Sequence, residues 1–330
     1  MQNVYFITLC GGSGTRLWPL STKKRPKQLI PFINNKTLLE DTIDRISHIS
    51  DKKHIGICTT KEQSKLIPNY IKEKIGFVIE EPVPKNTGPA ILYSCFEILK
   101  KDKNSISVFL ASDHYIPGTE KYCSYLKKAI EHAQTTSNII NLGLVPKFSS
   151  TGYGYIQVDS KKINSGEIYP VKKFHEKPNT YEAEQYVKQK NMLWNISMFV
   201  GKTNSFIREF QFHTPKIYFS IKNNAYENSP KTSIDYAIME KSKNISVLPC
   251  DFEWSDVGNL KTFLEIQQKH QKESSQIINI DSKNNSVKSN KKIVTFIGVD
   301  NLCIVETDDT ILISKIDLVE RVKEVSETIN

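Results

Sequence analysis

Glycines and positively charged side chains lie close together near the N-terminus of this 330-residue chain. Residues 9–20 read LCGGSGTRLWPL, and PKQ follows at 26–28. The glycines of this stretch are Gly11, Gly12 and Gly14. Glycine can adopt backbone angles that other residues avoid, and successive N–H groups in such a turn suit a phosphate anion. Arg16 adds a planar guanidinium and Lys27 an ammonium, so the stretch can bind a nucleoside polyphosphate.

The spacing of these glycines excludes two better-known loops. A dinucleotide-binding fingerprint, G-x-G-x-x-G, that starts at Gly12 would need a glycine where the chain has Leu17. A P-loop, G-x-x-x-x-G-K-[ST], that starts at Gly11 would need a glycine where the chain has Arg16. A nicotinamide oxidoreductase is therefore disfavoured. A tight turn without a ligand is the alternative, and the adjacent Arg16 and Lys27 favour phosphate binding over it.

Carboxylates follow apolar segments further along the chain. Asp113 comes after a run that ends at Ala111, and Asp256 lies in WSDVG. Each alone is typical of a helix cap or turn, although Mg²⁺ also prefers one or two carboxylates with phosphates and water. Glu176 and Lys177 are adjacent; a carboxylate suits sugar hydroxyls and an ammonium suits a phosphate, but such a pair alone is more often part of a solvated surface.

The first half of the chain alternates between segments of strand and helix character. Strands are predicted at 4–9, 55–59, 77–80, 107–111 and 139–144, and helices at 37–50, 61–75 with a kink at Pro68, 87–100 with Thr87 as N-cap, and 120–136. This alternation predicts parallel βαβ units and a doubly wound α/β sheet. Ligands of such sheets bind at the carboxyl ends of the strands, where the glycine loop, Asn86–Thr87 and Asp113 are expected.

The second half has a mixed pattern and ends in short β-prone runs. Strands are predicted at 153–159, 168–174 and 193–200, helices at 181–189, 233–241 and 259–268, a polar linker at 267–276, short strands at 277–281, 292–297, 303–306 and 310–314, and a closing helix at 319–325. Residues 151–254 are thus predicted to form a mixed α/β segment.

Composition and charge exclude several classes of protein. The net charge is +9, but the lysines are scattered, which disfavours nucleic-acid binding and is compatible with anionic small molecules. No apolar run approaches the ~18 residues of a membrane span, and the N-terminus has no signal-peptide pattern, so a cytoplasmic protein without a membrane partner is expected. The six cysteines form no C-x-x-C pair, so reduced thiols are expected rather than disulfides or a zinc site.

The glycine loop carries a resemblance to a known family. GGSGTRL at 11–17, followed by PKQ, resembles the signature of sugar-1-phosphate nucleotidylyltransferases, and WPLS at 18–21 is similar to the mannose-1-phosphate guanylyltransferase branch. The resemblance covers nearly the whole chain. It implies a nucleotidyltransferase-type, Rossmann-like doubly wound mixed sheet: a catalytic domain at 1–270, with a nucleotide-binding part at 1–150 and a sugar-phosphate-binding part at 151–270, and a small β-helix-like domain at 275–330. The isomerase domain of longer relatives is not expected.

The resemblance also implies roles for particular residues. The implied reaction joins GTP and mannose 1-phosphate to give GDP-mannose and pyrophosphate, with Mg²⁺ as cofactor. The implied catalytic residues are Arg16 and Lys27; nucleotide-binding residues are Leu9, Gly11, Gly12, Ser13, Gly14, Thr15, Asn86 and Thr87; sugar-phosphate-binding residues are Gly154, Glu176, Lys177 and Asn195; and metal ligands are Asp113 and Asp256. The partners are thus GTP and a sugar 1-phosphate, and a homodimer is left open.

The chain departs from the family pattern beside Asn195. Ile196-Ser197 stands where the family usually has Ser-Gly, which predicts a shifted preference of the sugar pocket. Two alternatives therefore remain: an enzyme that uses another sugar, such as a manno-heptose phosphate, and a catalytically inactive homologue that senses nucleotide sugars. The presence of Arg16, Lys27, Asp113 and Asp256 argues against the inactive homologue.

Overall fold

The computed structural model describes residues 3–12, 14–160, 162–270, 277–289 and 292–329. Contacts between Cα atoms divide the chain into two compact units that alternate along the sequence. The first comprises Met1–Gly11, Ile43–Ser112 and Ile116–Trp254, and the second Gly12–Thr42, Asp113–Tyr115 and Ser255–Asn330. The domain limits at 150, 270 and 275 remain a prediction. No helix among the described residues is long and apolar enough to cross a membrane.

A mixed β-sheet forms the centre of the first unit. Its nine strands, as far as the chain is described, run in the order β5-β4-β1-β6-β10-β7-β11-β9-β8, and β8 also pairs with β10. They are β1 (Val4–Cys10), β4 (Ile55–Thr60), β5 (Phe77–Glu81), β6 (Ile106–Ala111), β7 (Ile139–Leu144), β8 (Gly154–Val158), β9 (Tyr169–His175), β10 (Met192–Lys202) and β11 (Ile245–Cys250). The strands β5, β4, β1 and β6 are parallel, whereas β10 is antiparallel to β6 and β7. The predicted mixed α/β fold is confirmed.

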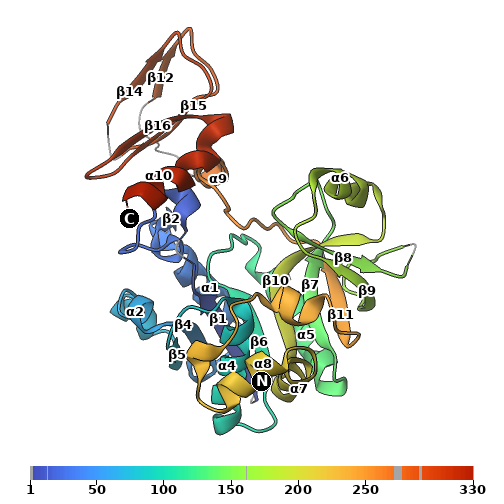
Figure 1. Cartoon of the computed structure of the whole chain (residues 1–330). Helices are drawn as coiled ribbons and strands as arrows, with labels where there is room; N and C mark the ends of the chain where they lie inside the picture. The colour runs from blue at the N-terminus through green and yellow to red at the C-terminus, as the bar shows by residue number, and fades with distance from the viewer. Residues whose placement is uncertain (1–2, 13, 161, 271–276, 290–291, 330) are drawn as a thin grey trace. The chain divides into compact units, whose positions relative to one another are not determined.

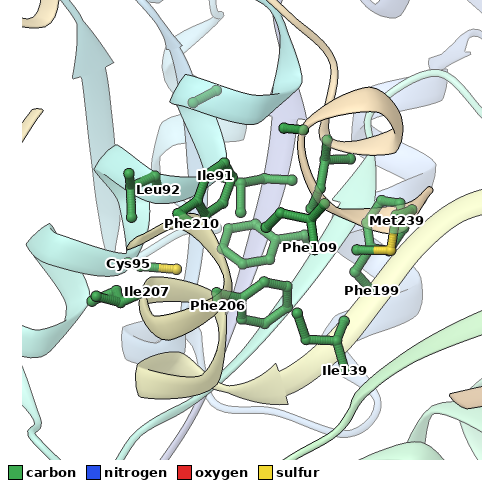
Figure 2. Packing of buried hydrophobic residues seen from close by; sticks show 14 of the residues in the cluster. Ile91, Leu92, Cys95, Phe109, Ile139, Phe199, Phe206, Ile207, Phe210 and Met239 are labelled. Atoms are coloured by element: carbon green, nitrogen blue, oxygen red, sulfur yellow. The ribbon is translucent and has the colours of Figure 1, made fainter. Parts of the chain in front are cut away.

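Helices of this unit bury apolar residues against the sheet. Figure 2 shows Ile91 and Cys95 of α4 (Thr87–Lys101) near Phe206 and Phe210 of α7 (Thr203–His213), with Phe109 of β6 in the same cluster. The helix α8 (Pro215–Lys222) packs on α4 and α7, while α5 (Thr119–Thr135) packs on β6, β7, β10 and β11 (Figure 1). Burial of these side chains is the main stabilising contribution to the unit.

Several local predictions differ from the structure. The N-cap of α4 is Asn86 rather than Thr87, because the Asn86 side chain accepts from the Thr87 backbone N–H. The predicted helix at 61–75 is two short helices, α2 (Lys61–Ser64) and α3 (Asn69–Lys72), since the ring of Pro68 interrupts the pattern. Residues Asp235–Met239 form a π-helix inside the segment predicted as an α-helix. The helices α6 (Thr180–Lys188) and α9 (Leu260–His270) agree with prediction.

The second unit joins the N-terminal loop to the C-terminal region. Its elements are the 3₁₀ turns η1 (Thr15–Leu17) and η2 (Lys27–Leu29), the hairpin β2 (Pro31–Ile33) and β3 (Lys36–Thr37), α9, the strands β12 (Ile277–Ile280), β13 (Ser286–Lys288), β14 (Val294–Ile297), β15 (Leu302–Glu306) and β16 (Ile311–Lys315), the 3₁₀ turn η6 (Ile316–Arg321) and α10 (Val322–Ile329). The helix α1 (Leu38–Ser47) belongs to both units. Leu17 and Trp18 share one apolar cluster with Val319 and Val322, so the C-terminal residues form part of the support of the glycine loop.

Candidate functional site

In the second unit, the glycine loop packs directly against Lys27. Gly14 has φ +66°, and a Cβ at this position would lie 2.4 Å from the Cβ of Lys27. Both the backbone angle and the space therefore require glycine at position 14. Gly11 and Gly12 have φ outside the left-handed region, and among the described atoms none lies within 4 Å of a Cβ added at either. These two glycines leave open space beside the backbone.

Lys27 connects the two predicted metal ligands. Its Nζ donates to Asp113 Oδ2 at 2.8 Å and to the backbone oxygen of Asp256 at 2.6 Å. Tyr115 and Ser255 exchange backbone hydrogen bonds of 2.9 and 3.0 Å, and this antiparallel bridge aligns the two aspartate segments. Burial by itself would raise the pKa of Asp113, but the Lys27 ammonium outweighs it, so this pKa lies below its usual value. Asp113 is therefore ionised at neutral pH.

The backbone after Asp256 has an unusual conformation. Val257 has φ +46°, which is an outlier for a β-branched residue, and its side chain is fully buried. A Cβ at Gly258 would lie 2.7 Å from Asp256 Oδ2, so the absence of a side chain there leaves room for the carboxylate. Strained backbone of this kind persists only where the surroundings over-determine it, as they do at many functional sites.

The aspartates fit one class of metal ion. No group of three or more His, Cys, Asp or Glu in the described part of the chain could hold a metal ion by itself. Mg²⁺ is typically bound by one or two carboxylates together with phosphates of the substrate and water. Two aligned aspartate segments that already accept hydrogen bonds from an ammonium group suit such an ion, provided that the substrate supplies further ligands.

The remaining residues predicted to bind nucleotide lie in both units. Leu9 is partly buried near the end of β1, Gly11 is exposed, Thr15 opens η1, and Arg16 is exposed. Ser13 lies outside the described residues.

Asn86 and Thr87 form the start of α4 in the first unit. Asn86 has φ +72° and ψ 178°, a combination that is otherwise almost restricted to glycine. Thr87 Oγ1 accepts from the Ile234 backbone N–H at 3.0 Å, and the Gly88 N–H donates to the Thr232 oxygen at 3.0 Å. A Cβ at Gly88 would lie 2.8 Å from that oxygen, which explains glycine at this position. The helix start is thus fixed to the segment that leads into the π-helix.

Three predicted sugar-binding residues meet on neighbouring strands of the first unit. Gly154 of β8 is in register with Asn195 of β10, and Glu176 directly follows β9 on the other side of β8. A Cβ at Gly154 would lie 2.6 Å from Glu176 Oε2 and 3.3 Å from Asn195 Nδ2. The structure therefore brings these three residues together around one point, as a shared ligand would require.

Glu176 and Lys177 carry the charges of this group. Lys177 Nζ donates to Glu176 Oε1 at 2.5 Å, while the buried Oε2 has no hydrogen-bond partner among the described residues. Burial, with the nearby Asp235 carboxylate as a smaller cause, raises the pKa of Glu176. Burial would lower the pKa of Lys177, but its hydrogen bond to Glu176 reverses this, and the pKa lies above its usual value. The lysine is thus a stable cation with a half-exposed side chain.

Two further polar residues that the sequence analysis missed complete the group. Asn141 of β7 is fully buried and donates from Nδ2 to Asn195 Oδ1 at 2.9 Å. Asp235, at the start of the π-helix, is 7% exposed and accepts from Asn195 Nδ2 at 2.9 Å. An asparagine in the middle of an apolar strand was the signal for Asn141. The role of Asp235 depends on a tertiary contact that no local pattern indicates.

Ile196-Ser197, where the chain departs from the family pattern, coincides with a strand irregularity. The register between β10 and β7 shifts between Asn195 and Phe199. Ile196 is fully buried, whereas Ser197 is exposed and has φ +53°. The Ser197 N–H donates to Asn195 Oδ1 at 2.8 Å. The chain therefore has a serine in a left-handed conformation that glycine adopts more readily.

Comparisons with known proteins match nearly the whole chain. The family described as Nucleotidyl transferase matches residues 6–273, and the MannoseP isomerase/GMP-like beta-helix domain matches residues 275–329. Mannose-1-phosphate guanylyltransferase 2 of Escherichia coli O157:H7 is 33% identical over an alignment of 352 residues, gaps included. The alignment covers 97% of this chain and 72% of that protein. A mannose-1-phosphate geranyltransferase structure from Thermus thermophilus has a TM-score of 0.87 and 28% identity over 99% of both chains. A mannose-6-phosphate isomerase structure from Helicobacter pylori, with a TM-score of 0.64 and 25% identity, covers 77% of this chain and 99% of its own.

Proposed function

Because the chain belongs to the mannose-1-phosphate guanylyltransferase family, as its motifs predicted, we propose that it makes GDP-mannose from GTP and mannose 1-phosphate. A phosphate oxygen of the sugar phosphate attacks the α-phosphorus of GTP. The new P–O bond forms as the bond from the α-phosphorus to the β-phosphate oxygen breaks, and pyrophosphate leaves. The nucleophile is already an anion, so the reaction requires positive charge and positioning more than a strong base.

The triphosphate is assigned to the glycine loop and its neighbours. Arg16 and Lys27 contribute positive charge, and the open backbone at Gly11 and Gly12 lets phosphate oxygens approach N–H groups. Ser13, Gly14 and Thr15 continue this loop, while Leu9, Asn86 and Thr87 are assigned to the nucleoside side.

The metal is assigned to Asp113 and Asp256. The nucleotidyl transferase family generally uses a divalent metal. We identify it as Mg²⁺, since two carboxylates suit an ion that takes its other ligands from phosphates and water. When bound, Mg²⁺ would neutralise charge that develops on the phosphates. Lys27, which donates to both aspartate segments, keeps Asp113 ionised and fixes its position.

The sugar phosphate is assigned to the group around Gly154. Glu176 accepts from a sugar hydroxyl, Lys177 binds the phosphate, and Asn195 contacts the sugar ring through its amide. The observation that carries this assignment is the buried Glu176 Oε2, which has no donor among the described residues and faces Gly154. A buried acceptor without a donor is costly, so a ligand hydroxyl at this oxygen would stabilise the site.

The test is pyrophosphate release from GTP, Mg²⁺ and mannose 1-phosphate. Parallel reactions replace GTP by ATP, UTP or dTTP, and replace mannose 1-phosphate by glucose, fucose or manno-heptose 1-phosphate. Fastest release with GTP and mannose 1-phosphate supports the proposal. Faster release with another sugar phosphate would reassign the substrate, and no release with any pair would favour a nucleotide-sugar-sensing homologue.

A further inference from the structure

The side-chain amide of Asn195 has almost all of its hydrogen-bonding capacity occupied. Its oxygen accepts from Asn141 Nδ2 at 2.9 Å and from the Ser197 backbone N–H at 2.8 Å. Its nitrogen donates one hydrogen to Asp235 Oδ1 at 2.9 Å. An amide oxygen has two lone pairs and an amide nitrogen has two hydrogens. With these contacts made, Asn195 has one N–H left for a ligand and no acceptor.

Two of the three partners indicate which way the amide points. A backbone N–H such as that of Ser197 can only donate, and it therefore requires the amide oxygen on its side. On the other side of the amide, the carboxyl oxygen Oδ1 of Asp235 is the acceptor for the amide nitrogen. The orientation of an Asn amide is inferred from its network; here the backbone N–H of Ser197 fixes it, and the contact with Asp235 agrees. A flipped Asn195 would place donors against a donor and an acceptor against an acceptor.

Asn195 Nδ2 and the unpartnered Glu176 Oε2 both lie beside Gly154. The would-be Cβ of Gly154 is 2.6 Å from Glu176 Oε2 and 3.3 Å from Asn195 Nδ2, so both atoms border the same small region. We propose that Asp235 and Asn141 are positioning residues that orient the Asn195 amide, so that Asn195 Nδ2 donates to, and Glu176 Oε2 accepts from, one and the same hydroxyl group of the sugar. This inference rests on the proposed function and adds to it a rule for the substrate.

The rule follows from the chemistry of the two groups. A hydroxyl can accept from an N–H and donate to a carboxylate at the same time. A methoxy group can accept but not donate, and a deoxy position can do neither. A site with fixed polar groups rejects analogues that leave those groups unpaired much more strongly than an apolar pocket rejects a change of size. The hydroxyl that contacts both groups is therefore required, and its deoxy analogue should be the poorest substrate.

The experiment combines variants with deoxy substrates. Steady-state pyrophosphate release is measured for wild type, Asp235→Ala, Asp235→Asn, Asn195→Ala and the Asp235→Ala/Asn195→Ala double variant. The sugar substrates are mannose 1-phosphate and its 2-, 3-, 4- and 6-deoxy analogues. Asp235→Ala removes the acceptor for the Asn195 amide, while Asp235→Asn retains an oxygen that can accept. Thermal denaturation reports folding, and Asn141→Leu provides a second positioning variant if Asp235→Ala does not fold.

We expect Asp235→Ala to raise KM for mannose 1-phosphate roughly tenfold to a hundredfold, with KM for GTP changed less than about twofold. Asp235→Asn should recover most of this loss. In the Asn195→Ala background, Asp235→Ala should add almost nothing, because the residue acts through Asn195. One deoxy analogue should be a poor substrate for wild type and show no further loss with Asp235→Ala.

Other outcomes overturn the inference in distinguishable ways. Equal effects of Asp235→Ala in the wild-type and Asn195→Ala backgrounds would show a structural role that does not depend on the amide. Equal use of all four deoxy analogues by wild type would show that no hydroxyl is bound by both groups. Failure of wild type to use GTP with mannose 1-phosphate would instead refute the proposed function itself, before any variant is compared.

Discussion

Asn195 and Glu176 in the first unit lie in a network of side-chain hydrogen bonds, whereas Asp113 and Asp256 in the second unit are connected through one lysine and an unusual backbone. Asn195 has three partners from three different segments. Lys27 donates to both aspartate segments of the second unit, and Val257 beside them has a strained φ of +46°. The first arrangement fixes the direction of hydrogen bonds, and the second fixes the position of charges.

This difference matches the chemistry assigned to Asn195 and Glu176 and that assigned to Asp113 and Asp256. Sugar isomers differ in the direction of neutral hydroxyl groups, so their recognition depends on donors and acceptors with a defined orientation. Phosphates are recognised mainly through electrostatic attraction. The energy of this attraction decreases gradually with distance, so it tolerates small displacements. Substitutions at Asn195 and Glu176 should therefore reduce mainly sugar specificity, and substitutions at Asp113 and Asp256 mainly turnover.

The largest effect is expected from the two aspartates of the second unit. Asp113→Asn and Asp256→Asn each remove a charge where the metal is assigned, so kcat should fall on the order of a hundredfold to ten-thousandfold. Turnover is measured at limiting Mg²⁺, and thermal denaturation verifies folding. The matched control is Asp159→Asn, which breaks an exposed ion pair with Lys172 and should have no effect. Near-wild-type rates in both variants would refute the metal assignment.

A smaller effect is expected from the glycine that contacts Lys27. Gly14→Ala introduces a Cβ 2.4 Å from the Lys27 Cβ at φ +66°, so stability should fall by about 1–2 kcal/mol or more, and turnover should fall with it. Chemical denaturation and GTP titration measure the two effects. Gly118→Ala is the control, because among the described atoms none lies within 4 Å of its added Cβ. Equal stability of both variants would contradict the packing of the loop on Lys27.

The pKa values of Glu176 and Asp113 are shifted in opposite directions, which predicts different behaviour of the two carboxylates at low pH. The pKa of Glu176 is raised, so this carboxylate becomes protonated at a higher pH than an ordinary glutamate and can then no longer accept as a carboxylate. The pKa of Asp113 is lowered, so Asp113 stays ionised. As the pH falls, KM for mannose 1-phosphate should therefore rise before kcat declines.

A comparison with Glu176→Gln tests this pH dependence. The sugar phosphate itself takes up a proton near pH 6, and this affects both proteins equally. The difference between the two pH profiles of KM therefore reports Glu176. Parallel profiles would contradict a role for its ionised form.

The smallest effect is expected at the strand irregularity. Ser197→Gly relieves a left-handed serine and should stabilise the fold by at most about 1 kcal/mol, while it changes the ranking of sugar phosphates by less than about tenfold. Thermal denaturation and the sugar panel measure this. Asn224→Gly, also at positive φ, is the control. It should change stability less than Ser197→Gly, since Asn tolerates this conformation. A loss of stability in Ser197→Gly would contradict strain at this position.

The sequence predicted the parts of the molecule that depend on local patterns. Apolar periodicity placed β1, α4 and α5 within a few residues, because burial repeats with the period of each element. The strand β11 was not predicted; it contains Pro249, and proline is uncommon inside a sheet. The glycine loop was recognisable because Gly14 is required by its own backbone angle.

The contacts of the candidate site depended on tertiary structure. Asp235 and Asn195 are forty residues apart, and only the packing of the π-helix near β10 brings them within hydrogen-bonding distance. The N-cap of α4 is Asn86, whose side chain accepts from the Thr87 N–H, while the Thr87 hydroxyl accepts from the Ile234 N–H. Such pairings arise from the whole fold, and a single sequence contains no local signal for them.

The central claim is the division of substrates between the two groups of residues, and it is tested most directly by one pair of variants. Lys177→Ala and Arg16→Ala are titrated with GTP and with mannose 1-phosphate in the pyrophosphate-release assay, with Lys172→Ala as an exposed-lysine control. We predict that Lys177→Ala raises KM for mannose 1-phosphate at least about tenfold and leaves KM for GTP nearly unchanged, whereas Arg16→Ala impairs GTP use and turnover. A Lys177→Ala variant that loses affinity for GTP alone would contradict the account.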